Sequence, residues 1–261
     1  MVELVIASTF HHFMEKGRTS PAIFSCSGTQ GEGEFVVKLR GGMEFGTGAL
    51  LCELYASMLG AYFGMSCPRP AVVLIEENLA EAVAKHLIRD ERGRQIMRNS
   101  IGLNFGSQFL TDLSPWPVDK QIPANLEEAA FNVFAFDALI QNPDRTFKNP
   151  NLGTRGDDLF IFDHECAFSF LVNPLPSDRP WLLHSETYLE KHVFAKLLRR
   201  LPFPPDFIQS LADLSGEVIE RFSEQVPAAW RSSHLGKIES HLKLMQEHSA
   251  EFANEITRRF A

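Results

Sequence analysis

The stretch N-P-D-R-T-F-K-N at residues 142–149, followed by L-F-I-F-D at residues 159–163, decides how this chain is interpreted. It places Asp144 and Asn149 five residues apart, and a second carboxylate, Asp163, comes after a short apolar run. Carboxylate and amide oxygens can orient a hydroxyl group and can hold a hard cation such as Mg²⁺ across phosphates. The spacing therefore favours phosphoryl transfer.

A turn between these two motifs brings them together. Gly153, Gly156 and Asp157 predict a tight turn that leads into the run LFIF, and such a hairpin returns Asp163 to the neighbourhood of Asn149. The catalytic loop of protein kinases, H-R-D-x-x-x-x-N, has the same spacing from Asp to Asn, and a second metal-binding Asp follows a short hairpin. Taken singly, these residues are also ordinary turn formers, but their order favours the catalytic interpretation.

A buried lysine is expected in the first third of the chain. Lys38 lies inside the apolar run EFVVKL, where a lysine on a half-buried face needs a partner, and Glu53 lies on the following predicted helix. Kinases use such a strand lysine and helix glutamate to bind the phosphates of ATP. The alternative for Lys38 is an edge-strand side chain whose ammonium reaches solvent.

The composition excludes several other classes of protein. The chain has 261 residues, 44% of them hydrophobic and 22% charged, which is typical of a folded globular protein. The net charge of −8 argues against nucleic-acid binding. The four cysteines form no C-x-x-C pair, and no apolar run reaches the ~18 residues of a membrane span. We expect a cytoplasmic protein that binds neither membrane nor nucleic acid.

The hydrophobic patterns predict an α+β chain with two lobes, and the kinase-like spacing of Asp144, Asn149 and Asp163 leads us to expect a bilobal, protein-kinase-like fold. We expect a sheet-rich lobe at residues 1–106, a connection at 107–118 and a helical lobe at 119–261, because the S-P-W-P stretch interrupts the pattern. The expected strands are residues 2–10, 21–27 and 34–39 as an antiparallel meander, then 70–76 and 102–110, with short strands within 142–165. The expected helices are residues 49–64, 78–92, 126–140, 186–200, 205–226 and 232–260.

Two glycine-containing turns could face phosphates. The sequence GTQGEG at residues 28–33 carries Glu32, which would repel a nucleotide, whereas residues 16–21, KGRTSP, join the first two expected strands as a kinase phosphate loop does. We therefore expect the nucleotide to be bound by the backbone and side chains of the second turn: Gly17, Arg18, Thr19 and Ser20. The alternative is a simple surface turn.

Several motifs in the same order resemble the HipA-like kinases, in particular the short members without an extra N-terminal subdomain. The matching segments are GRTSP (17–21), FVVKL (35–39), ELYASMLG (53–60), CPRPAVV (67–73), GLNFGSQFL (102–110), and DALIQNPDRTFKNPNL running into LFIFDHECAF. Related phosphoinositide-kinase-like proteins share a D-R-H-x-x-N loop. This chain matches that loop at Asp144, Arg145 and Asn149 and has Thr146 in place of the histidine.

The resemblance implies ATP and Mg²⁺ as cofactors and a Ser/Thr protein kinase activity on a protein substrate. It implies that Asp144 is the catalytic base, that Asn149 and Asp163 bind the metal, and that Lys38 with Glu53 grips the phosphates. Lys148 is also expected to bind the nucleotide. An antitoxin-like partner, as longer members have, is possible but has no support in this sequence.

Two other functions remain open. Thr146, and D-H-E at residues 163–165 where protein kinases have D-F-G, would also suit a pseudokinase that binds nucleotide as an interaction module. A third possibility keeps catalysis and transfers AMP to protein.

Overall fold

The structure is a computed structural model that describes residues 1–15, 18–117, 121–183, 186–198 and 204–260. Its contacts divide the chain into two units, which are described separately. Unit 1 comprises Met1–Leu54, Pro68–Thr111 and Gln225–Arg231, and unit 2 comprises Tyr55–Cys67, Asp112–Glu224 and Ser232–Ala261. The lobe and connection boundaries expected from the sequence stay a prediction.

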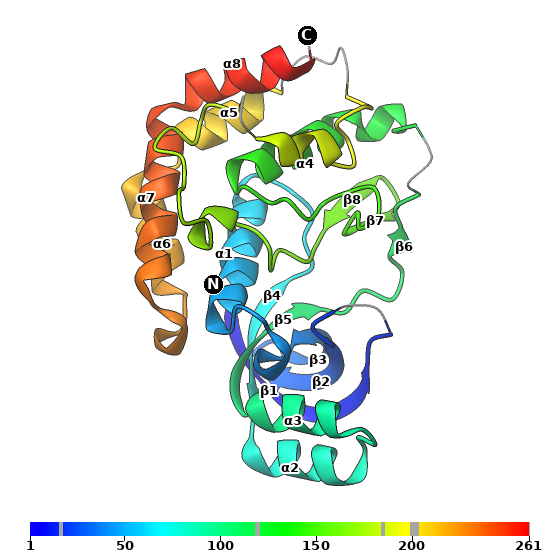
Figure 1. The fold of residues 1–261 in the computed structure, drawn as a ribbon. Coiled ribbons are helices and arrows are strands. Elements are labelled where there is room, and N and C mark those ends of the chain that lie inside the picture. Colours follow the sequence, from blue (N-terminus) through cyan, green and yellow to red (C-terminus); the bar gives the residue numbers. More distant parts are fainter. Residues whose placement is uncertain (16–17, 118–120, 184–185, 199–203, 261) are drawn as a thin grey trace. The chain divides into compact units, whose positions relative to one another are not determined.

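Unit 1 contains a five-stranded sheet that closes on itself (Figure 1). Its strands are β1 (Glu3–Phe13), β2 (Ala22–Gly28), β3 (Gly31–Lys38), β4 (Pro70–Ile75) and β5 (Gly102–Gln108). Their order is β1-β2-β3-β5-β4, and every neighbouring pair is antiparallel except β1 with β4, whose parallel pairing closes the sheet. The expected three-stranded meander is confirmed as β1 to β3.

The interior of this sheet is lined by alternate residues of its strands, as the period of two requires. Phe24, Phe35, Val37 and Val73 are each at most 1% exposed and belong to one apolar cluster. Residues 28–33 form the β2–β3 hairpin, in which Gly28 pairs with Gly31 across a two-residue turn. Gly31 has a φ of 101°, a conformation that favours glycine.

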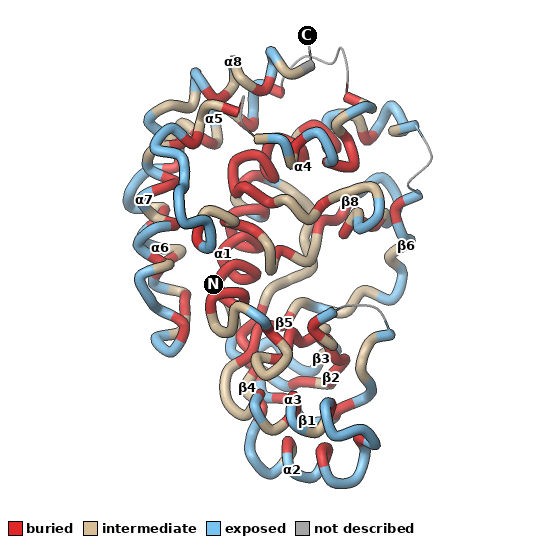
Figure 2. Tube along the Cα trace, viewed as in Figure 1, coloured by how far each residue is buried: buried red, intermediate tan, exposed pale blue. Residues whose placement is uncertain are grey.

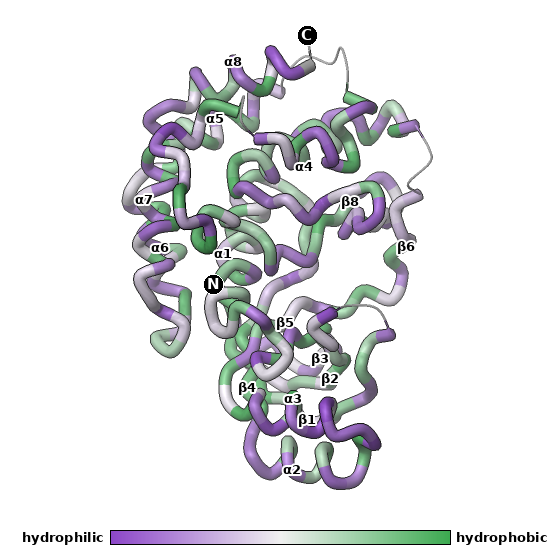
Figure 3. Tube along the Cα trace, in the orientation of Figure 1, coloured by the Kyte–Doolittle hydropathy of each residue, from purple (hydrophilic) through white to green (hydrophobic). Residues whose placement is uncertain are grey.

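The helical segment of unit 1 differs from the single helix expected at residues 78–92. The structure has α2 (Glu77–His86), which mixes hydrophilic and hydrophobic residues, and α3 (Glu91–Asn99), which is largely hydrophilic (Figure 3). Asp90 has an extended backbone, and its carboxylate accepts a hydrogen bond from the Gly93 amide at 2.7 Å. An N-cap at this position begins a new helix, so the expectation of one helix was wrong.

Helix α1 (Thr47–Tyr62) matches the helix expected at residues 49–64, and the boundary between the units falls inside it, after Leu54. The other helices of unit 2 are α4 (Glu127–Leu139), α5 (Pro205–Ala212), α6 (Gly216–Glu224), α7 (Ser233–Glu247) and α8 (Ser249–Phe260). Helix α4 is buried over most of its length (Figure 2), as its apolar composition predicts. No helix among the described residues combines the length and apolar character needed to cross a membrane.

The prediction of a helix at residues 186–200 is wrong for most of residues 186–198, the part of this range that the structure describes. A short 3-10 helix, Thr187–Lys191, is followed by His192, whose φ of −59° and ψ of 141° are not helical. The backbone of His192 forms an isolated antiparallel bridge with Thr146, and the amide of Val193 donates to the carbonyl oxygen of Arg145 at 3.1 Å. Because the Val193 amide donates to Arg145 and not to a residue of the preceding turn, the helix does not continue past His192.

Unit 2 also holds a small sheet of order β6-β7-β8. Its strands are β6 (Ser114–Pro115), β7 (Leu152–Arg155) and β8 (Asp158–Ile161), all antiparallel. The hairpin of β7 and β8 is the one expected from the glycines near residue 155, and Gly156 in its turn has a φ of 60°. This hairpin carries the chain from Asn151 to Asp163.

Candidate active site

The loop between α4 and β7 carries the residues that the sequence singled out. Helix α4 ends at Leu139, and Gln141 then takes a left-handed backbone conformation, with φ of 47°, that turns the chain away from the helix axis. The loop continues through Asp144 and Asn149 into β7. The fold thus places these two side chains at the C-terminal end of a buried helix.

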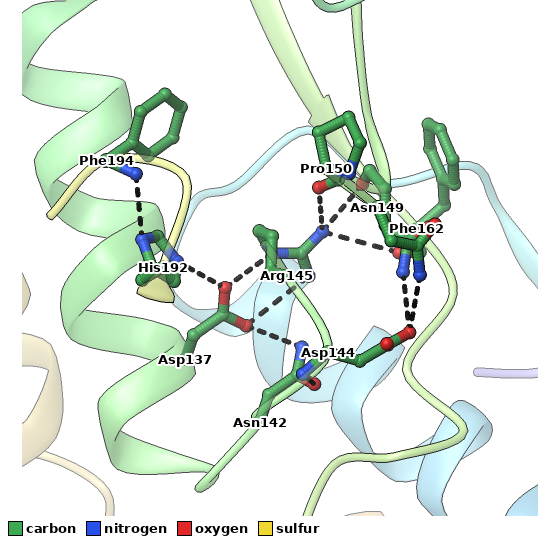
Figure 4. Close-up of polar contacts among 10 residues, drawn as sticks. Asp137, Asn142, Asp144, Arg145, Asn149, Pro150, Phe162, His192 and Phe194 are labelled. Atoms are coloured by element: carbon green, nitrogen blue, oxygen red, sulfur yellow. Dashed lines mark hydrogen bonds and ion pairs between the residues drawn. The ribbon is translucent and has the colours of Figure 1, made fainter. Parts of the chain in front are cut away.

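The carboxylate of Asp144 is held by two amide side chains (Figure 4). Its Oδ2 accepts hydrogen bonds from Asn149 Nδ2 at 2.8 Å and from Asn151 Nδ2 at 3.1 Å. The Asp144 backbone amide donates to Asn142 Oδ1 at 3.2 Å. These bonds orient the carboxylate and leave Oδ1 to receive a proton.

The charge environment makes Asp144 a stronger base than an ordinary aspartate. Partial burial raises the pKa of its carboxyl, and the negative charges of Asp163 and Glu165 raise it further. The hydrogen bonds from Asn151 and Asn149 act in the opposite direction without cancelling the increase. A carboxylate with a raised pKa suits the task of accepting a proton from a hydroxyl group.

The donor atoms near Asp144 fit a hard divalent cation. A carboxylate oxygen of Asp163 and one of Glu165 lie within 4.8 Å of each other. Asn149 Nδ2 donates to Asp144, and the amide oxygen Oδ1 is the acceptor atom of the same side chain. Carboxylate and amide oxygens are the ligands that Mg²⁺ prefers. Asp163 also has a φ of 60°, a strained conformation of the kind found at functional sites.

In unit 1, the expected pair of Lys38 and Glu53 forms. Lys38 Nζ lies 3.2 Å from Glu53 Oε1, and the two side chains are 9% and 1% exposed. The alternative of a solvent-reaching lysine on an edge strand is therefore wrong, because β3 is paired on both sides and the lysine is buried. Such a pair fixes the ammonium in place.

The expected phosphate loop is only partly described, because Gly17 lies outside the described residues. Thr19 is buried, Ser20 has a φ of 53°, and Arg18 forms an exposed ion pair with Glu44 at 3.1 Å. A Cβ at Gly42 would lie 2.3 Å from the Thr19 carbonyl oxygen, so only glycine allows this close packing. Nucleotide binding by this loop stays a prediction.

Lys148 is exposed in the loop between α4 and β7, and its role in nucleotide binding also stays a prediction. The site predicted from the sequence did not include Asn151, whose side-chain amide donates to Asp144, or Glu165, whose charge raises the pKa of Asp144. It also did not include Asp137, a carboxylate inside the apolar helix α4 that is fully buried beside Arg145. Asp137 could have been found, because a charged residue in an apolar helix requires a partner.

The α+β architecture and the base, amide and carboxylate arrangement are those of a kinase-type phosphotransferase. The family model of the HipA-like kinases matches residues 7–256, and the chain therefore belongs to this family. The resemblance to the HipA-like kinases, expected from the sequence motifs, is confirmed.

The chain is also similar to the crystal structure of a proinflammatory kinase, CtkA, from Helicobacter pylori. The TM-score is 0.54 at 13% sequence identity, over 95% of this chain and 93% of that chain. At this identity the likeness shows a kinase-like fold and nothing about the substrate. A comparison with curated proteins found no match.

Proposed function

We propose that this HipA-like kinase transfers the γ-phosphate of ATP to a serine or threonine hydroxyl of a protein. The observation that carries the proposal is the oriented, raised-pKa carboxylate of Asp144 beside the oxygen donors of Asp163 and Glu165. Asp144 would accept the hydroxyl proton as the acceptor oxygen bonds to the γ-phosphorus. The bond from that phosphorus to the bridging oxygen breaks, and ADP leaves with the electron pair.

The remaining residues would bind and orient the nucleotide. Asn149 and Asp163 would hold Mg²⁺, which, when bound, neutralises charge on the phosphate oxygens. Asn149 would also keep Asp144 oriented through its amide nitrogen. Lys38, held by Glu53, would bind phosphate oxygens, since a fixed ammonium is a point charge suited to them.

Labelled ATP tests this function against its alternatives. Purified chain is incubated with Mg²⁺, a mixed acceptor such as casein, and ATP labelled in either the α or the γ phosphate. We expect γ label on protein, and its loss in Asp144→Asn. Label from the α position would instead indicate AMP transfer. Binding of ATP without transfer of either label would indicate a pseudokinase, and both results would overturn the proposal.

A further inference from the structure

Directly beside Asp144, a buried ion pair joins the catalytic loop to helix α4 (Figure 4). Arg145 is 1% exposed and Asp137 is fully buried. Arg145 Nε donates to Asp137 Oδ2 at 2.5 Å, and Arg145 Nη2 donates to Oδ1 at 3.4 Å. The phosphotransfer described above uses neither residue. Burying two charges is costly, so a pair kept at this position requires an explanation.

The third nitrogen of the same guanidinium reaches the backbone on both sides of the β7–β8 hairpin. Arg145 Nη1 donates to the carbonyl oxygen of Asn151 at 2.6 Å, and it lies 3.4 Å from the carbonyl oxygen of Phe162 and 3.5 Å from that of Pro150. Pro150 directly follows Asn149, and Phe162 directly precedes Asp163. Arg145 itself directly follows Asp144.

Arg145 is therefore the sequence neighbour of Asp144, and its side chain contacts the sequence neighbours of the two residues assigned to metal binding. Arginine can do this because its planar guanidinium presents five N–H donors in a fixed fork. A lysine ammonium would keep the positive charge opposite Asp137 but could not maintain the same fork of bonds. The geometry thus favours a role in positioning over one in charge balance alone.

Asp137 is oriented in turn by His192. The ring Nδ1 of His192 accepts a hydrogen bond from the Phe194 amide at 3.1 Å, so the ring proton lies on Nε2, which donates to Asp137 Oδ2 at 3.0 Å. Asn142 Nδ2 donates to the other oxygen at 2.9 Å. Burial raises the pKa of Asp137, but the positive charge of Arg145 and the bond from His192 outweigh it and lower the pKa to about 2. The carboxylate is thus ionised and fully bonded.

We propose that Asp137, Arg145 and His192 are positioning residues for phosphoryl transfer. Arg145, anchored on Asp137, keeps Asp144, Asn149 and Asp163 in register with one another. His192 keeps Asp137 oriented, and the amide of the next residue, Val193, attaches this segment to the loop by donating to the carbonyl oxygen of Arg145. This inference rests on the proposed function for its kinetic consequence, but its structural consequence can be measured without catalysis.

The main test compares Arg145→Lys with the native chain. Because a displacement of about 1 Å costs on the order of 100-fold in rate, we expect kcat to fall about 100-fold while the KM for ATP changes less than about three-fold. Hydrogen exchange of the backbone amides should speed up at residues 144–151 and 162–163. The matched control is His241→Leu, which removes another buried bond, from His241 Nε2 to the carbonyl oxygen of Leu139 at 2.7 Å. It should lower the unfolding temperature without changing kcat or exchange in the loop.

A second pair of variants keeps the test decisive if Arg145→Lys does not fold. His192→Gln retains a nitrogen donor toward Asp137, whereas His192→Leu does not, so kcat should be higher in the glutamine variant. Equal kcat in these two variants, or an Arg145→Lys variant with native kcat and native exchange, would overturn the inference. If the native chain transfers no γ-phosphate, the proposed function fails, and hydrogen exchange alone then decides whether Arg145 positions the loop.

Discussion

Removing one partner of the buried pair between Lys38 and Glu53 should strongly destabilise the chain. The Nζ to Oε1 distance is 3.2 Å, and the side chains are 9% and 1% exposed. At this distance the Coulomb attraction is about 5 kcal/mol for an effective dielectric constant of 20, and desolvation of both charges offsets much of it. Lys38→Met leaves the carboxylate buried without this partner, so we expect the free energy of unfolding to fall by about 3–5 kcal/mol.

An exposed pair in the same unit gives a matched control. Arg98 Nε also lies 3.2 Å from Glu81 Oε2, but these side chains are 37% and 49% exposed. The distance between the charged atoms is the same in both pairs, so the comparison of their free energies of unfolding tests the effect of burial. Because exposed pairs contribute ~0–1 kcal/mol, Arg98→Met should change the free energy of unfolding by less than about 1 kcal/mol.

The measurement is a double-mutant cycle by urea denaturation, with Lys38→Met, Glu53→Leu and both together. The double variant should be at least about 2 kcal/mol more stable than the sum of the two single effects predicts, because it leaves no buried charge uncompensated. We expect the double variant to be inactive, since it lacks the ammonium that we propose to bind phosphate. Single effects that add to within ~0.5 kcal/mol would refute the assignment of a coupled, desolvated pair.

Four further predictions concern the other assigned residues. Asp144→Asn should keep Mg²⁺-dependent ATP binding and reduce phosphate transfer about 100-fold or more. Because folding raises the pKa of Asp144, the free energy of unfolding should fall as the pH rises above the ordinary pKa of an aspartate, and Asp144→Asn should lose this decrease. Asp163→Asn should weaken ATP binding measured with Mg²⁺, and unchanged binding curves would remove it from the metal site. The pKa of Asp137 is lowered to about 2 from 3.8, so the ionised carboxylate should contribute ~2 kcal/mol of stability that is lost as pH falls from about 4 to about 2. In Asp137→Asn, the free energy of unfolding should therefore depend less on pH over this range. Replacing Thr19 and Ser20 by alanine should raise the apparent Kd for ATP several-fold, and an unchanged Kd would place the phosphates elsewhere.

Local patterns predicted the elements well where a single period dominates. The alternation around Val37 and the helical spacing around Leu54 gave strands and a helix within a few residues of their observed ends. The glycines near residue 155 predicted the hairpin of β7 and β8, whereas the hydrogen bond from Asn149 to Asp144 was not predicted. The same patterns failed at Asp90, where a capping side chain ends one helix and starts another.

The network under the catalytic loop could not be read from spacing. Asp137 and His192 are 55 residues apart, and their contact depends on how the intervening loop, hairpin and 3-10 segment fold back. The spacing of the hydrophobic residues around His192 predicted a helix, because such a pattern reflects only the local sequence. It contains no information about a distant partner such as Asp137. Only the presence of a charge inside α4 indicated that such a partner must exist.

Backbone strain explains why this region resists prediction from sequence. Among the described residues, five non-glycine residues have positive φ, and four of these lie around the catalytic and metal-binding loops: Gln141, Asn151, Asp163 and Phe168. Such conformations cost about 1–3 kcal/mol each and persist only where surrounding contacts over-determine them. Arg145 supplies such contacts by binding the carbonyl oxygens of Asn151 and Phe162. The buried ion pair and the strained backbone are thus parts of one arrangement, because Arg145, anchored on Asp137, binds carbonyl oxygens at or next to the strained residues Asn151 and Asp163.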